Sequence, residues 1–196
     1  MNLVLQESGA MVSDSVQKAP TYELGKYIDT DPETIFVYTK YCIHMKRKPH
    51  LYIQVRTNDG RLLPTVDIDC TPGGVDRQNK LDLIMTWFDR WPFALIQSSR
   101  DAFWLVFDKP CEIMDHALDY ITIPDIDAFC DRKYKDCARR QNQFVLRATP
   151  KNGFIPRVIK SNMITPEARE WLEEFVAYWS SGDVKEYVAI QAMNAL

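Results

Sequence analysis

The feature that most constrains the fold of this chain is a series of short apolar runs joined by short connections. Runs rich in β-branched and aromatic residues predict strands at 35–43, 50–57 and 62–70. Between the last two, residues 58–60 read Asn-Asp-Gly, a strong turn signal. Strands joined so closely pair antiparallel, because a parallel pair needs a long crossover. We therefore expect a mainly antiparallel sheet, with strand 64–70 near its centre.

Helical patterns alternate with the later strands. Apolar residues three and four positions apart, such as Leu81, Ile84 and Met85, predict helices whose apolar stripes pack on the sheet. The patterns predict helices at 76–91, 113–121, 125–137 and from Thr165 onward, and strands at 93–97, 103–107, 144–149 and 156–160. The expected fold class is α+β, a mainly antiparallel sheet with flanking helices packed on one face.

Nothing in the sequence divides the chain into several domains. Its 196 residues are 46% apolar and 26% charged, the balance of an ordinary globular protein, and no linker-like stretch occurs. Residues 1–20 are polar and rich in small residues after Leu5, which favours a loosely packed N-terminal arm. We expect a single α+β domain of catalytic type over residues 21–196.

The N-terminal sequence and the cysteines indicate a cytoplasmic protein. Residues 1–20 lack the basic stretch of a signal peptide, and no apolar run approaches membrane-spanning length, so we expect no membrane partner. The five cysteines are odd in number and show no close pairing, which is typical of a reducing compartment. No Cys-x-x-Cys occurs and the three histidines lack zinc-finger spacing, so a structural zinc site is not expected.

Charge is distributed unevenly along a chain of net charge −3. Residues 40–56 are basic without an acid, residues 111–131 are acidic without a base, and residues 132–160 carry many bases against a single acid. This asymmetry predicts a basic surface for a nucleic-acid backbone, and it agrees equally well with solvated helix faces. The residues that we expect to contact nucleic acid are Lys46, Arg47, Lys48, Arg139 and Arg140.

The sharpest chemical feature is Val66-Asp67-Ile68-Asp69. Alternate residues of a strand share a face, so Asp67 and Asp69 should project together, while Val66 and Ile68 point into the core. Two neighbouring carboxylates repel each other unless a cation compensates them, and Mg²⁺ or Mn²⁺ prefers such oxygen ligands. Asp67 and Asp69 are therefore candidate metal ligands and catalytic residues. The alternative is an edge strand with two solvated acids.

Two further segments carry groups that suit phosphate. The apolar strands within 93–107 hold Ser98, Ser99 and Arg100 at their turn, and hydroxyls, turn amides and a guanidinium bind phosphate groups. A polar turn between core strands is the simpler alternative. Arg147 lies in the strand-like segment 144–149, where it would neutralise a triphosphate or form a salt bridge with one of the aspartates.

Taken in order, these motifs resemble those of the archaeo-eukaryotic primase superfamily, in its divergent phage and plasmid members. An Asp-x-Asp strand, a helix, an apolar strand ending in a serine-containing turn and a strand with a basic segment follow one another over residues 35–160. The segment FVLRATPK resembles an arginine-containing segment of the phage and plasmid members, with Arg147 matching the arginine. The resemblance implies an RRM-like sheet and a DNA primase or primase-polymerase, a nucleotidyltransferase of DNA replication that uses Mg²⁺ or Mn²⁺.

The resemblance also implies roles for individual residues. Asp67 and Asp69 would hold the metal ions, and Ser98 or Ser99 would begin the second motif and contact nucleotide phosphate. Family members carry a histidine a few residues later, whereas residues 102–104 of this chain read Ala-Phe-Trp. Template DNA, nucleotides and other replication proteins are the implied partners.

Other classes of function stay open. A degenerate primase-like module would bind nucleic acid as a replication initiator without catalysis, and the missing histidine favours it. An unrelated structural or interaction protein would leave both aspartates merely solvated. A metal-dependent nuclease has less support, because Asp108-Lys109 lacks the residue that such motifs place between acid and lysine. The third acidic residue of the primase pattern would be Asp131.

Overall fold

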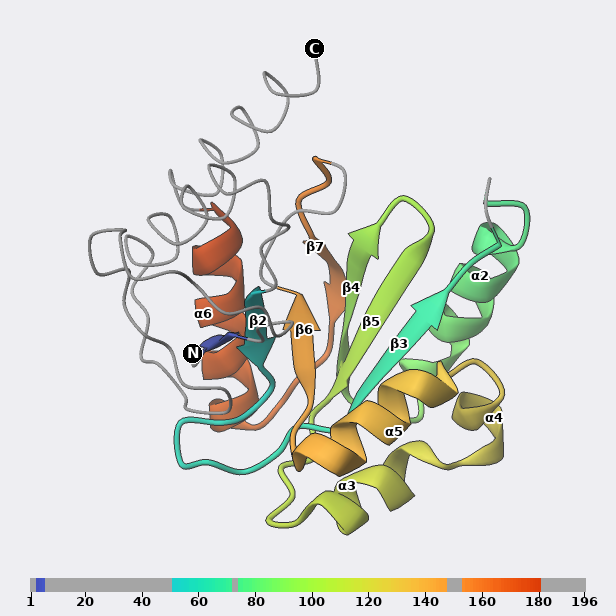
Figure 1. The fold of residues 1–196 in the computed structure, drawn as a ribbon. Helices are drawn as coiled ribbons and strands as arrows, with labels where there is room; N and C mark the ends of the chain where they lie inside the picture. Colours follow the sequence, from blue (N-terminus) through green and yellow to red (C-terminus); the bar gives the residue numbers. More distant parts are fainter. Residues whose placement is uncertain (1–2, 6–50, 72–73, 148–152, 181–196) are drawn as a thin grey trace, which may run out of the picture. The chain divides into compact units, whose positions relative to one another are not determined.

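The computed structural model describes residues 3–5, 51–71, 74–147 and 153–180 (Figure 1). These residues fall in two compact units, one formed by 55–144 with 154–179 and the other by the remaining described residues. The strand expected at 35–43 and most of the expected N-terminal arm lie outside the described residues. The single domain expected over 21–196 stays a prediction.

The smaller unit holds a three-stranded antiparallel sheet in the order β1-β2-β6. β1 spans Leu3–Leu5, β2 spans Leu51–Gln54 and β6 spans Val145–Arg147. Ile53 of β2 pairs with Leu146 of β6, and both side chains are buried. β2 and β6 thus lie within the strands expected at 50–57 and 144–149.

The larger unit holds a four-stranded antiparallel sheet in the order β3-β5-β4-β7. Its strands are β3 (Thr65–Asp69), β4 (Phe93–Ser99), β5 (Ala102–Phe107) and β7 (Arg157–Ser161). The described helices are α2 (Arg77–Trp87), α3 (Met114–Ile121), α4 (Pro124–Asp127), α5 (Arg132–Gln141) and α6 (Pro166–Ser180). The expected α+β fold is confirmed, while its RRM-like arrangement stays a prediction.

The hairpin of β4 and β5 forms the centre of this sheet because its strands are apolar on both faces. Every residue of β5 and all but the last residue of β4 are buried. On one face, Phe93 contacts Phe88 at the end of α2 and Phe107 contacts Tyr120 of α3, with ring centroids 4.1 and 5.5 Å apart. Each fully buried phenylalanine stabilises the fold by about 1.5–3 kcal/mol.

Helices cover both faces of the sheet, so the expectation of helices on one face was wrong. Neighbouring residues of a strand point to opposite faces, and Trp104 therefore points away from the face that holds Phe103. Trp104 packs against Phe175 of α6, with 6.5 Å between the ring centroids. A sheet whose central strands are apolar on both sides needs an apolar layer on each side.

β3 is an end strand of this sheet and not a central strand as expected. The Leu63 N–H donates to the carbonyl oxygen of Val55 at 3.1 Å, which continues the hairpin around the 58–60 turn. That pairing stops at Pro64, which has no N–H to donate, and beyond it β3 pairs with β5. Because β3 carries acids on one face, it cannot be buried on both sides as β4 and β5 are.

The helix expected over 125–137 is interrupted between α4 and α5. Asp131 has non-helical backbone angles (φ −63°, ψ 114°), and its N–H donates to the carbonyl oxygen of Asp67 on β3 at 3.0 Å. The Asp131 carboxylate accepts a hydrogen bond from the backbone N–H of Lys133 at 2.9 Å and so caps α5. A hydrogen bond to a distant strand thus overrides the local helical pattern.

α6 begins at Pro166, as the Thr165-Pro166 pair predicts. Asp108, just beyond β5, is buried and accepts hydrogen bonds from the backbone N–H groups of Ile164 and Thr165 and from the Thr165 hydroxyl. A carboxylate at this position satisfies free N–H groups and complements the helix dipole. Asp108, which does not match a nuclease motif in the sequence, therefore anchors the start of α6.

Candidate functional site

Asp67 and Asp69 lie on one face of β3, as their spacing predicts. Val66 and Ile68 are fully buried, whereas Asp67 is half-buried and Asp69 is exposed. Asp67 stands opposite Trp104 of β5. The side chains of the two aspartates therefore lie on the same side of the sheet, with solvent access at Asp69.

A backbone N–H at the start of α5 and a side chain of α2 lie at the outer edge of β3. The carbonyl oxygen of Asp67 accepts the hydrogen bond from Asp131, and the carbonyl oxygen of Asp69 accepts one from Lys80 Nζ at 2.6 Å. Lys80 also forms an ion pair with Asp76 at 2.8 Å. These contacts block the edge against a further strand. They also hold Asp131, the candidate third acid, and the ammonium group of Lys80 next to the aspartate pair.

The electrostatic field near Asp67 is negative. Burial, with smaller contributions from the negative charges of Asp127, Asp67 and Asp131, raises the pKa of the Cys130 thiol to about 12 against the opposing effect of Lys135. Asp127 forms an ion pair with Lys135. The Cys130 thiol therefore stays protonated at neutral pH and does not act as a thiolate ligand. The same field favours a bound cation near Asp67 and Asp131.

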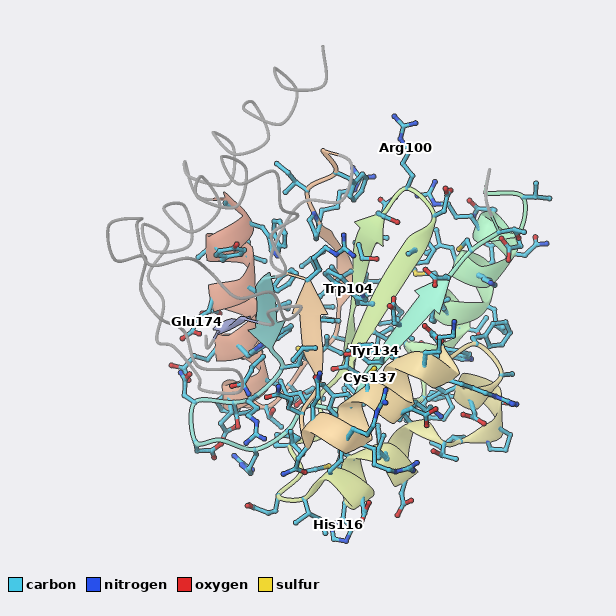
Figure 2. The ribbon with its side chains drawn as sticks, viewed as in Figure 1. Arg100, Trp104, His116, Tyr134, Cys137 and Glu174 are labelled. Atoms are coloured by element: carbon cyan, nitrogen blue, oxygen red, sulfur yellow. The ribbon has the colours of Figure 1, made fainter. Side chains whose placement is uncertain are left out.

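The turn between β4 and β5 lies beside the C-terminal end of β3. The backbone N–H of Cys70 donates to the carbonyl oxygen of Asp101 at 2.7 Å. Ser98 is buried at a register shift in β4, whereas Ser99 is half-buried and its Oγ accepts a hydrogen bond from the Asp101 N–H at 3.3 Å. Figure 2 shows Arg100 extending from the tip of the hairpin, away from the strands. The structure thus brings Ser99 and Arg100 to the end of the sheet that carries Asp69.

Residues that the sequence did not single out also surround this end of the sheet. The guanidinium carbon of Arg77, in the first turn of α2, lies 5.7 Å from the centroid of the Phe103 ring. Gly74 has a positive φ of 70°, and a Cβ there would approach Asp101 Oδ1 to 3.3 Å, so the loop before α2 packs closely on the β4–β5 turn. Hydrogen bonds from Lys80 and from the backbone N–H of Thr71 hold the pKa of Asp76 well below its usual range. The four-residue spacing of Asp76 and Lys80 was the signal that could have revealed this pair.

The remaining expected site residues lie elsewhere. Arg139 and Arg140 are exposed in the last turn of α5. Arg147 is exposed on β6, in the smaller unit, opposite Tyr52 of β2. The basic residues Lys46, Arg47 and Lys48 lie outside the described residues.

The aspartate pair fits a divalent cation by the chemistry of its oxygen atoms. Mg²⁺ is commonly bound through one or two carboxylates, and waters and substrate phosphates complete its coordination. Within the described ranges, no group of three or more His, Cys, Asp or Glu side chains is arranged to hold a metal ion. Asp67 and Asp69 are the residues of this site that would hold such a cation.

No described helix is both long enough and apolar enough to cross a membrane. Comparison with known proteins adds no relative whose function could guide the interpretation of this site. No family model, no curated protein and no solved structure matches the chain.

Proposed function

We propose that this chain is a divalent-metal-dependent nucleotidyltransferase of the primase-polymerase type, which joins nucleotides on a DNA template. The observation that carries the proposal is the position of Asp67 and Asp69 on one accessible face of β3, beside the β4–β5 turn. Oxygen ligands and a phosphate-binding turn at one end of a sheet are the two elements that nucleotide transfer requires.

Each residue of the site would have a separate role in nucleotide transfer. The Asp67 and Asp69 carboxylates hold Mg²⁺ or Mn²⁺, and a bound cation stabilises the negative charge that develops on the transferred phosphate. Ser99 and Arg100 bind the triphosphate. The 3′-hydroxyl of the growing strand loses its proton to water, its oxygen forms a bond to the α-phosphorus, the bond from the α-phosphorus to the oxygen bridging to the β-phosphate breaks, and pyrophosphate leaves.

A reducing, cytoplasmic location is part of this proposal. The free thiols of Cys70, Cys111, Cys130 and Cys137 support a reducing compartment, and other replication proteins would be the partners there.

A second candidate function is nucleic-acid binding without catalysis. The observation that favours it is Trp104, which stands opposite Asp67 in the region where the primase pattern has its histidine. Trp104 is only 7% exposed and packs on α6, so it does not replace a polar group that contacts a nucleotide.

Direct synthesis of a primer separates the two functions. The purified protein is incubated with a single-stranded DNA template, nucleotides and Mg²⁺ or Mn²⁺, and the products are resolved by size. We expect products from the parent protein and from the control Asp89→Asn, whose exposed carboxylate lies just after α2. Asp67→Asn and Asp69→Asn should yield none. Absence of product from the parent in both metals, with retained binding of the template, would contradict the enzyme and support the second candidate.

A further inference from the structure

We propose that the outward face of α5 binds the phosphate backbone of a single-stranded nucleic acid and leads it toward Asp67 and Asp69. This inference rests on the proposed function, because it assigns the path of the template to the same site. The face carries Arg132, Lys133, Arg139 and Arg140 around the exposed Asp136, all four cationic side chains are exposed, and the formal charge of the face is 4 − 1 = +3. Residues separated by seven or eight positions lie two turns apart on the same side of a helix, so the four cations form one surface.

Packing on the opposite side of α5 fixes the direction of this surface. Ala138 is buried, and the ring of Tyr134 stacks on Phe144, with centroids 6.3 Å apart. Tyr134 and Cys137 lie along the margin of α5 that borders the strands in the view of Figure 2. The helix therefore cannot turn its cations inward without losing these contacts.

The outward cations have no acidic partner among the residues that the structure describes. Lys135, on the inner side of α5, forms an ion pair with Asp127, whereas none of the four outward side chains forms such a pair there. Arg140 Nε donates only to a backbone carbonyl oxygen, that of Asp136, and its guanidinium also contacts the sulfur of Cys137. Positive charge on this surface is thus available to an external anion.

The first-turn pair opposes the stability of its own helix. The N-terminus of a helix carries a partial positive charge, so cations there are unfavourable and acids are favourable. α5 has Arg132 and Lys133 in that turn, and the acid at this end of the helix is the N-cap Asp131. Arg139 and Arg140 sit at the negative end, where the dipole favours them. The helix dipole therefore favours the last-turn pair and disfavours the first-turn pair.

The position of α5 connects this surface to the aspartates. Asp131, immediately before Arg132, donates its N–H to the carbonyl oxygen of Asp67. The helical rise separates Arg132 from Arg140 by about 12 Å, which spans about three phosphates of a stacked strand. A nucleic-acid strand that lies along α5 would therefore reach β3 at the candidate metal site.

Salt-dependent binding of a labelled single-stranded oligonucleotide, measured by fluorescence anisotropy without divalent cations, tests the proposal. The first variant is Arg132→Gln with Lys133→Gln, and the second is Arg139→Gln with Arg140→Gln. The control, Lys109→Gln with Arg169→Gln, removes the same charge from exposed positions outside α5. Each lost phosphate contact lowers the slope of log affinity against log salt by about 0.7, so each α5 variant should lose about 1.4.

The control should keep the slope of the parent protein. The proposal would be overturned if the α5 variants kept the salt slope of the parent protein, or if the control lost as much of that slope as they do. Polyglutamate and an unlabelled oligonucleotide of the same charge are each tested as competitors of the labelled oligonucleotide. If polyglutamate competes equally well, the proposal is overturned in favour of an acidic protein partner. The two proposals can fail separately. If the α5 variants bind more weakly but the parent protein makes no primer, only the catalytic proposal is removed. Primer synthesis with unchanged binding by both variants removes only this inference.

Discussion

Replacing Asp69 by asparagine tests whether the aspartate pair binds metal or supports the fold. Asparagine keeps the shape of the side chain and removes its charge. The rise of a strand places residues 67 and 69 about 6.7 Å apart. At that separation two like charges repel by about 0.6 kcal/mol in a water-like medium and by about 2.5 kcal/mol at an effective dielectric constant of 20. Because Asp69 is exposed and Asp67 is half-buried, we expect a value toward the lower end.

The metal-free variant should therefore be as stable as the parent protein or more stable, by up to about 1 kcal/mol. A divalent cation at 100 times its dissociation constant should stabilise the parent by about 2.7 kcal/mol. For a chain of this size that free energy raises the Tm by about 5–11 °C. Asp69→Asn should lose this shift, whereas the control Asp89→Asn should keep it.

Thermal melts in EDTA and in Mn²⁺, with and without a nucleotide, measure both effects. A structural role has the opposite sign in EDTA, because removing one partner of an exposed charge pair destabilises the protein, by up to about 1 kcal/mol. The reasoning would be refuted by a marked fall in the Tm of metal-free Asp69→Asn together with no metal-dependent shift in the parent protein.

Three further predictions concern the stability and reactivity of the larger unit. Asp108→Ala should lower the free energy of unfolding in urea by about 2–4 kcal/mol, since the start of α6 loses its acceptor, and Asp108→Asn should lose less; equal stability of the alanine variant and the parent would contradict this. Hydrogen bonds from Arg61 and Thr57 lower the pKa of Asp59 to about 2, so its contribution to stability is present above its unfolded pKa of about 4 and is lost as the pH falls toward 2. Asp59→Asn should flatten acid unfolding in that window, and a variant with the parent's profile would argue against the effect. Iodoacetamide at pH 8 should alkylate the half-buried Cys137 well before the buried Cys130, whose pKa is about 12, as mass spectrometry of the native protein can follow; equal rates would show that Cys130 is accessible and ionised.

The sequence alone determined the features that depend on local backbone geometry. The common face of Asp67 and Asp69 follows from the two-residue repeat of a strand, and it holds whatever strand lies next to it. The apolar runs of β4 and β5 predicted the two strands themselves, whereas the helix layer on the second face of the sheet was not expected. Thr165-Pro166 marked the start of α6 because those residues suit the first turn of a helix.

Only the tertiary structure decided which distant groups meet at the site. Strand spacing does not reveal a partner strand, so the sequence could not show that β3 would pair with β5 at the end of the sheet. The contact between Asp131 and Asp67 joins residues 64 positions apart, and its hydrogen bond ends a helical pattern that the local sequence would have continued. The basic face of α5 depends on that same break. Local sequence sets the periodicity of each element, whereas the hydrogen bonds and apolar layers between elements determine where a carboxylate pair meets its neighbours.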